Sequence, residues 1–165
     1  MLVSRYLTMK SRLRLANRII MSRLLYLIQV WGSASKPTWI QKLQRVQNKA
    51  ARYVTKKNKF TKISILLSDC NWMSILQLIV FHSLLLFWKT VHLESGRFLY
   101  YGCIRKEDNY YKPRNNRILL TKLSWKSRSI LWWNELPDRV RNDCDFVSFK
   151  GSLRVWIFNN TRLKI

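Results

Sequence analysis

Acidic residues are scarce in this chain of 165 residues, which has 31 lysines and arginines against eight aspartates and glutamates. The formal net charge of +23 at pH 7 creates a strong self-repelling field, which an anionic partner would relieve. The first acidic residue is Asp69, so the segment before it has no negative charge at all. A protein that needed charge only for solubility would mix both signs. The imbalance therefore favours a phosphate-rich partner such as a nucleic acid. The alternative is that the chain is a piece of something larger whose acidic portion is absent.

Glycine, proline and cysteine are also rare, with four, three and three copies. So few turn-forming residues argue against an all-β fold and against low-complexity sequence. The cysteines are far apart and lack a Cys-x-x-Cys spacing, which indicates reduced thiols and argues against a zinc site. The amino terminus is broken by Arg5 and Lys10 and does not resemble a signal peptide. We therefore expect an intracellular protein, nuclear or cytoplasmic, that is not secreted.

Motifs for catalysis are missing from the sequence. It contains no Gly-rich phosphate loop, no Gly-x-Ser-x-Gly and no His-Glu-x-x-His. A metal-dependent enzyme needs carboxylates brought together, and the only neighbouring acids are Glu107 with Asp108 and Asp143 with Asp145. Both pairs lie in turn-like polar sequence. We expect no catalytic residue, no metal site and no cofactor.

The longest apolar stretch runs from residue 71 to residue 93, and no charged side chain interrupts it before Lys89. Ser74 and Gln77 have the spacing of a capping box, which predicts a helix that starts near Ser74 and stops at residues 94–96. A helix that is apolar nearly all round must be buried, either in protein or in lipid. A bilayer span needs about 20 mostly apolar residues. The uncharged run before Lys89 falls short of that, and it carries the polar residues Asn71, Ser74, Gln77, His82 and Ser83. We favour the core helix of a helical domain, and a single membrane span through 71–93 is the alternative.

A second helix is predicted from Pro37, because proline is common at the first helical position. Its apolar residues fall on one arc of a helical wheel, and basic residues fall on the opposite arc. The basic row continues beyond the helix, and no acidic residue compensates it. A solvated basic face is the alternative, but the length of the row favours contacts with phosphates, which position a backbone without reading sequence. The candidate nucleic-acid-binding residues are Lys42, Arg45, Lys49, Arg52, Lys56, Lys57, Lys59 and Lys62.

Helical periodicity predicts four further helices. The first spans residues 9–31, with Thr8 as its cap and Gly32 at its end. A short helix is expected to follow Thr61 as its cap and to run through Leu67. The remaining two run from Ser124 to a stop before Pro137, and over Phe146–Asn159, with residues 138–141 as a turn between them.

Residues 97–123 mix tyrosines with arginines and lysines, and Pro113 forbids a long helix there. We expect an irregular arm or a pair of short strands, with 118–120 as the most favoured strand. The tyrosines could stack on unpaired bases or could pin the arm onto a core. The sequence as a whole predicts a mainly α fold. A basic helical bundle (1–96), this arm (97–123) and a carboxy-terminal helical segment (124–165) would pack as one unit.

Four segments of the chain stand out together: IIMSRLLYLIQVWGSASKPTWIQKLQRVQNKAARYVT, LLSDCNWMSILQLIVFHSLLLFWK, SWKSRSILWWNELPDRVRN and SFKGSLRVWI. In this order they resemble the region after the polymerase core in reverse transcriptases of non-LTR (LINE-type) retrotransposons, particularly jockey-like elements. In that family the region supplies the thumb, a mostly helical bundle that closes over the template–primer duplex. The resemblance implies that the helix carrying Lys42 and Arg52 lies near a nucleic-acid backbone. The residues assigned to structure are Trp72, Trp133, Asn134, Pro137 and Phe149.

The chain departs from that family at the catalytic residues. The family's palm has paired aspartates and a further aspartate that hold two divalent metals, whereas this sequence has no Asp-Asp pair. Fingers, palm and endonuclease are missing as well. The resemblance therefore implies a non-catalytic remnant that binds RNA or DNA and could work with an intact polymerase palm in trans. The alternative is a truncated fragment that has no function without its palm.

Overall fold

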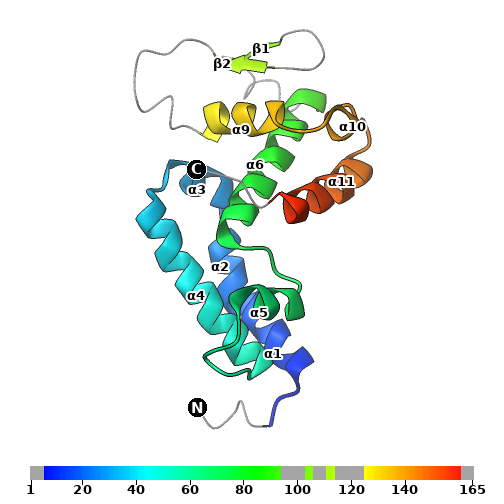
Figure 1. Ribbon diagram of the computed structural model, residues 1–165. Helices are drawn as coiled ribbons and strands as arrows, with labels where there is room; N and C mark the ends of the chain where they lie inside the picture. Colours follow the sequence, from blue (N-terminus) through cyan, green and yellow to red (C-terminus); the bar gives the residue numbers. More distant parts are fainter. Residues whose placement is uncertain (1–5, 94–102, 106–110, 114–124, 161–165) are drawn as a thin grey trace. The chain divides into compact units, whose positions relative to one another are not determined.

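The chain is mainly helical, as predicted, in the computed structural model, which describes residues 6–93, 103–105, 111–113 and 125–160 (Figure 1). The described helices are α1 (Met9–Ala16), the π-helical turn η2 (Asn17–Met21), α2 (Ser22–Leu25), α3 (Ile28–Ala34), α4 (Pro37–Thr55), α5 (Ile63–Asp69), α6 (Ile75–His92), α9 (Trp125–Asn134), α10 (Asp138–Arg141) and α11 (Phe146–Asn159). Two short strands, β1 (Cys103–Arg105) and β2 (Tyr111–Pro113), pair antiparallel with Ile104 opposite Lys112. They lie within the arm expected at 97–123, whereas the strand expected at 118–120 lies outside the described residues.

The chain forms two compact units. The first unit consists of residues 1–27 and 36–78, and the second consists of residues 28–35 and 79–165. The boundary falls inside α6, whereas the sequence placed it after residue 96. The segment that contains α3 belongs to the second unit, where it packs against α9. The division therefore differs from the expected three segments, because contacts between distant parts of the chain decide it.

Several helix starts follow local signals in the sequence. Pro37 is the first residue of α4, and the Thr8 side chain accepts a hydrogen bond from the Ser11 backbone N–H at 3.3 Å. At the start of α6 the capping box is closed in both directions. The Ser74 backbone N–H donates to Gln77 Oε1 at 3.0 Å, and the Gln77 backbone N–H donates to Ser74 Oγ at 3.3 Å. These three starts confirm the predictions made from the sequence.

Helix α6 is long and apolar enough to cross a membrane, judged by length and composition. Its 18-residue apolar window is 56% buried within the protein, and the core helix of a soluble protein passes the same test of length and composition. Length and composition alone therefore do not separate the two environments that the sequence left open.

The first predicted helix is not continuous, and its predicted end at Gly32 is wrong. After α2 the backbone is extended at Tyr26 (ψ 114°) and left-handed at Leu27 (φ 48°), so that α3 is a separate helix. Gly32 lies inside α3, and a Cβ added there would be 2.6 Å from Ile79 Cγ1 within the second unit. The glycine therefore serves close packing and not helix termination.

Two other local predictions need correction. Helix α5 begins at Ile63 with Lys62 as its N-cap and no side-chain capping bond, so Thr61 is not the cap. Residues 138–141, expected as a turn, form the short helix α10. The first difference moves the N-cap by one residue, and the second concerns four residues that form about one helical turn.

The second unit has an aromatic core. Phe87, Trp133 and Phe149 are almost completely buried, and the ring centroids of Phe87 and Trp133 are 5.1 Å apart. Tyr111 on β2 packs edge-on against Phe87 at 5.2 Å. Asn134 completes the attachment of β2, since its side chain donates to the Tyr111 carbonyl (2.9 Å) and accepts from the Tyr111 N–H (3.1 Å). Tyr111 therefore pins β2 onto the core, one of the two roles open to the tyrosines of this arm.

The remaining residues assigned to structure have structural contacts too. Trp72 is buried in the first unit and donates from Nε1 to Asn17 Oδ1 at 2.9 Å. The Pro137 carbonyl accepts the backbone N–H groups of Val140 (2.9 Å) and Arg141 (3.0 Å) at the start of α10.

Candidate nucleic-acid interface

Polar side chains on the inner face of α4 set the orientation of this helix. Gln47 is fully buried and donates from Nε2 to the Met73 carbonyl at 2.8 Å. The Ile75 backbone N–H donates to Gln44 Oε1 at 2.9 Å, and Gln44 Nε2 donates to Asn48 Oδ1 at 2.9 Å. Leaving such buried groups without partners is costly, so the bonds fix which side of α4 faces inward. The sequence signal for this network was three amides at helical spacing on the apolar side of α4.

Arg12 holds the carboxyl end of α4 in place. It is buried, and its Nε donates to the Val54 carbonyl in the last turn of α4 at 2.9 Å, while Nη1 donates to the Leu7 carbonyl. A cation at the carboxyl end of a helix also interacts favourably with the helix dipole. This arginine was not singled out from the sequence, because its position in a run of exposed cations gave no signal.

Three predicted contact residues share the outer face of α4. Lys42, Arg45 and Lys49 lie on the side of the helix away from the buried amides, and none forms an ion pair with a carboxylate in the described part of the chain. Lys42 Nζ lies 4.3 Å from the centre of the Trp39 ring. With the inner face held by Gln44 and Gln47, these three cations have no carboxylate partner among the described residues that would compete with a phosphate.

Arg52 differs from these three residues. Its side chain is half-buried, and Nη2 donates to the Lys59 carbonyl at 3.3 Å, which ties α4 to the loop that follows it. Its Nε is buried and has no hydrogen-bond partner within the described residues. Arg52 therefore has a structural contact, which the predicted row of contact residues did not include.

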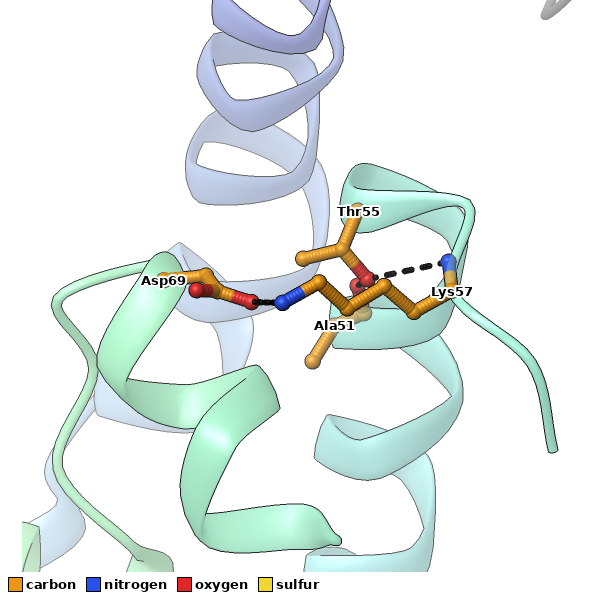
Figure 2. Close-up of polar contacts among 4 residues, drawn as sticks. All are labelled: Ala51, Thr55, Lys57 and Asp69. Carbon is orange, nitrogen blue, oxygen red and sulfur yellow. Dashed lines mark hydrogen bonds and ion pairs between the residues drawn. The ribbon is translucent and has the colours of Figure 1, made fainter. Parts of the chain in front are cut away.

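The prediction that no acid compensates the basic row is wrong at Lys57. Its Nζ lies 2.6 Å from a carboxylate oxygen of Asp69 at the end of α5 (Figure 2). The Lys57 backbone N–H also donates to Thr55 Oγ1 at 3.4 Å, and Thr55 Oγ1 in turn donates to the Ala51 carbonyl at 2.9 Å. Helix α5 packs against α4 and thus brings the first acidic residue of the sequence to this lysine. Lys57 is therefore not a free cation, because it is paired with Asp69.

The other three predicted residues lie in the loop between α4 and α5. Lys56 has a left-handed backbone (φ 54°) and donates its N–H to the Arg52 carbonyl at 2.8 Å, which ends α4. Lys59 Nζ lies 5.0 Å from the centre of the exposed Phe60 ring, and Lys62 precedes α5. All three side chains are exposed. They extend the cationic surface beyond the end of the helix.

The charge imbalance is concentrated in the first unit. Its sequence has fifteen lysines and arginines and a single acidic residue, Asp69, whereas the second unit has sixteen and seven. Because Lys57 occupies that one carboxylate, the remaining cations of the first unit have no acidic residue of their own unit to pair with. The outer face of α4 thus lies in a strongly positive field.

Some titratable groups lie outside this surface. Burial and, to a lesser degree, the Asp69 carboxylate raise the pKa of Cys70 to about 11. In the second unit, burial and the nearby Lys150 charge lower the pKa of His82. The described residues contain no group of three His, Cys, Asp or Glu side chains able to hold a metal ion.

Comparisons with protein-family models, with curated proteins and with solved structures find no match for this chain. The resemblance to non-LTR reverse transcriptases therefore stays a prediction that depends on the four sequence segments alone.

Proposed function

We propose that the first unit binds the sugar–phosphate backbone of RNA or DNA through the outer face of α4 and the loop that follows it. The observation that carries this proposal is the grouping of Lys42, Arg45 and Lys49 on one face, while the only acid of the unit pairs with Lys57. Cations that contact phosphates release the counterions condensed on a nucleic acid, which favours binding at low salt. Contacts of this kind position a backbone without reading its sequence.

The four-segment resemblance supports a nucleic acid over other polyanions. As a thumb helix, α4 would lie beside a template–primer duplex, and an intact polymerase palm could be a partner in trans. The proposal gives the chain no catalytic step, because the sequence lacks the paired aspartates of that family. It also implies that the chain acts where nucleic acid is present, in the nucleus or the cytoplasm.

The test is the salt dependence of binding. The triple variant Lys42→Gln, Arg45→Gln, Lys49→Gln removes three free cations and leaves Arg52 and Lys57 with their structural contacts. The slope of log affinity against log salt concentration on a duplex should become shallower by about 2.7, or about 0.9 for each lost phosphate contact. Fluorescence anisotropy with a labelled RNA–DNA hybrid measures this slope.

A control of equal charge loss separates local contacts from the general field of the protein. Arg139, Lys150 and Arg154 are exposed in the second unit, and their joint replacement by Gln removes the same three charges. This control should keep the slope of the unaltered protein. Equal slopes for both triple variants would contradict the assignment to α4.

A membrane span through α6 is the second candidate, favoured by the length and apolar composition of that helix. The two candidates differ in what keeps the purified chain in solution. A nucleic-acid-binding protein should stay soluble and helical without detergent, and should not float with neutral lipid vesicles. Flotation with such vesicles would favour the span.

A further inference from the structure

Trp39 is the one exposed tryptophan of this protein. All eight tryptophans lie in the described residues, and the other seven are buried or half-buried, whereas Trp39 is 57% exposed. An indole ring exposed to water lacks the large favourable free energy that burial of its apolar surface would give. Its position on the outer face of α4, beside the candidate cations, links this exposure to the same surface.

Trp39 belongs to an exposed stripe along α4. Trp39, Val46 and Tyr53 are spaced seven residues apart, nearly two full helical turns, and they are 57%, 46% and 38% exposed. We call these three residues the apolar stripe. The two aromatic ends of the stripe are separated by about 20 Å along the helix, from a rise of about 1.5 Å per residue.

Cations alternate with the apolar stripe. Lys42 and Lys49 lie between its members in the sequence and on the adjoining strip of the same outer face. Lys42 Nζ is 4.3 Å from the Trp39 ring centre, so the ammonium group and the indole already form a pair in the free protein. A phosphate bound by this lysine would place its own nucleotide next to the indole.

We propose that α4 prefers nucleic acid with unpaired bases, with Trp39 and Tyr53 stacking on two bases while Lys42 and Lys49 hold the phosphates between them. This inference rests on the proposed function and adds the substrate class. Aromatic side chains can stack on unpaired bases whatever their identity, since every base has a π-face. In a duplex the bases are stacked on each other and the faces are not accessible, so only the phosphate contacts remain.

The charges on α4 exclude a second copy of the same face as the occupant. An apolar residue every seven positions also suits a helical partner, but Lys42, Arg45 and Lys49 flank the apolar stripe and no acid lies on α4. Two such faces would bring like charges together. Single-stranded RNA or DNA combines negative charge with flat apolar groups, and both suit this face.

The test compares three probes of equal length, namely a single strand, the same strand with abasic sites throughout, and the blunt duplex. The variant Trp39→Ala, Tyr53→Ala keeps every charge. It should weaken binding to the single strand at least about 25-fold, since each of the two stacked bases contributes a factor of about five or more. Binding to the abasic strand and the duplex, and the salt slope on all three probes, should not change.

Two controls keep the result interpretable. Tyr6→Ala removes another exposed aromatic side chain of the first unit and should have no effect on any probe. Trp39→Phe keeps a stacking ring and should retain most of the single-strand affinity. Circular dichroism of each variant shows whether the helices are intact. A variant that has lost its helices is replaced by the double variant Trp39→Phe, Tyr53→Leu. This replacement is expected to lose most of the single-strand affinity that Tyr53 contributes.

The outcomes separate the two proposals. Equal affinity of the unaltered protein for the single strand and its abasic form would overturn base stacking and leave phosphate binding intact. A protein that binds none of the three probes would overturn both. The stacking role would also be contradicted if an acidic helical peptide competed fully with the single strand and the protein showed no preference for the single strand over its abasic form.

Discussion

Arg12 is buried, whereas the other described cations of the first unit are exposed or half-buried. Its guanidinium contacts the Val54 and Leu7 carbonyls, so it joins α1 to the last turn of α4. The same residue type thus has two uses in one unit, and burial decides between them. A cation with protein acceptors holds the scaffold, and a cation without them is available to a phosphate.

Replacement of Arg12 by Met should destabilise the protein. Methionine fills a similar volume without donors, so the two carbonyls lose their partners at a cost of about 1–3 kcal/mol in the free energy of unfolding. The exposed Arg14→Met is the matched control and should change stability by less than about 0.5 kcal/mol. Urea denaturation followed by circular dichroism measures both, and equal stability of the two variants would contradict the role given to Arg12.

At the scale of elements, the two described helical glycines have opposite surroundings. Gly32 in α3 faces the buried side chain of Ile79, and a Cβ added to this glycine would lie 2.6 Å from Ile79 Cγ1. Gly151 in α11 has open space where a Cβ would be. Helix propensity favours alanine at both positions, so any difference between them reports packing.

The pair Gly32→Ala and Gly151→Ala should therefore change stability in opposite directions. Gly151→Ala should stabilise the protein by about 0.5–1 kcal/mol, because alanine loses less conformational freedom in a helix. Gly32→Ala should destabilise it by about 1–3 kcal/mol, because Ile79 must shift in a packed core. Thermal unfolding of the two variants measures this, and a gain in stability at position 32 would show that α3 packs less closely against Ile79.

The sequence predicted helix ends correctly where a local signal, such as a proline or a capping box, marks the end. Pro37 starts α4, Ser74 and Gln77 cap α6, and the last helix has the predicted bounds Phe146–Asn159. The break before α3 was missed, because the left-handed residue is Leu27 and not a glycine or asparagine. No local pattern marks such a residue, since the surrounding packing imposes its conformation.

The candidate interface was predicted only in part, because local periodicity can be read from the sequence and packing between helices cannot. Helical periodicity places Lys42, Arg45 and Lys49 on the outer face of α4, where the structure has them. The pairing of Lys57 with Asp69 could not be predicted, since it depends on how α5 packs against α4. The exposure of Trp39 was missed because a tryptophan at an apolar position is normally expected in the core.

At the scale of the whole molecule, charge is divided unequally between the two units. The first unit has one acidic residue for its fifteen cations, and the second has seven for its sixteen. The second unit instead has the larger aromatic core, built around Phe87, Trp133 and Phe149. This division agrees with the proposal that the first unit provides the contact with nucleic acid.

The most direct test of this division is to map where nucleic acid contacts the protein. Single-stranded RNA containing 4-thiouridine is crosslinked to the purified chain by light, and the adducts are located by mass spectrometry. We predict adducts within residues 37–62, with Trp39 and Tyr53 among the modified positions. Adducts confined to the second unit, or a yield that the Lys42→Gln, Arg45→Gln, Lys49→Gln variant does not reduce, would contradict nucleic-acid binding through α4.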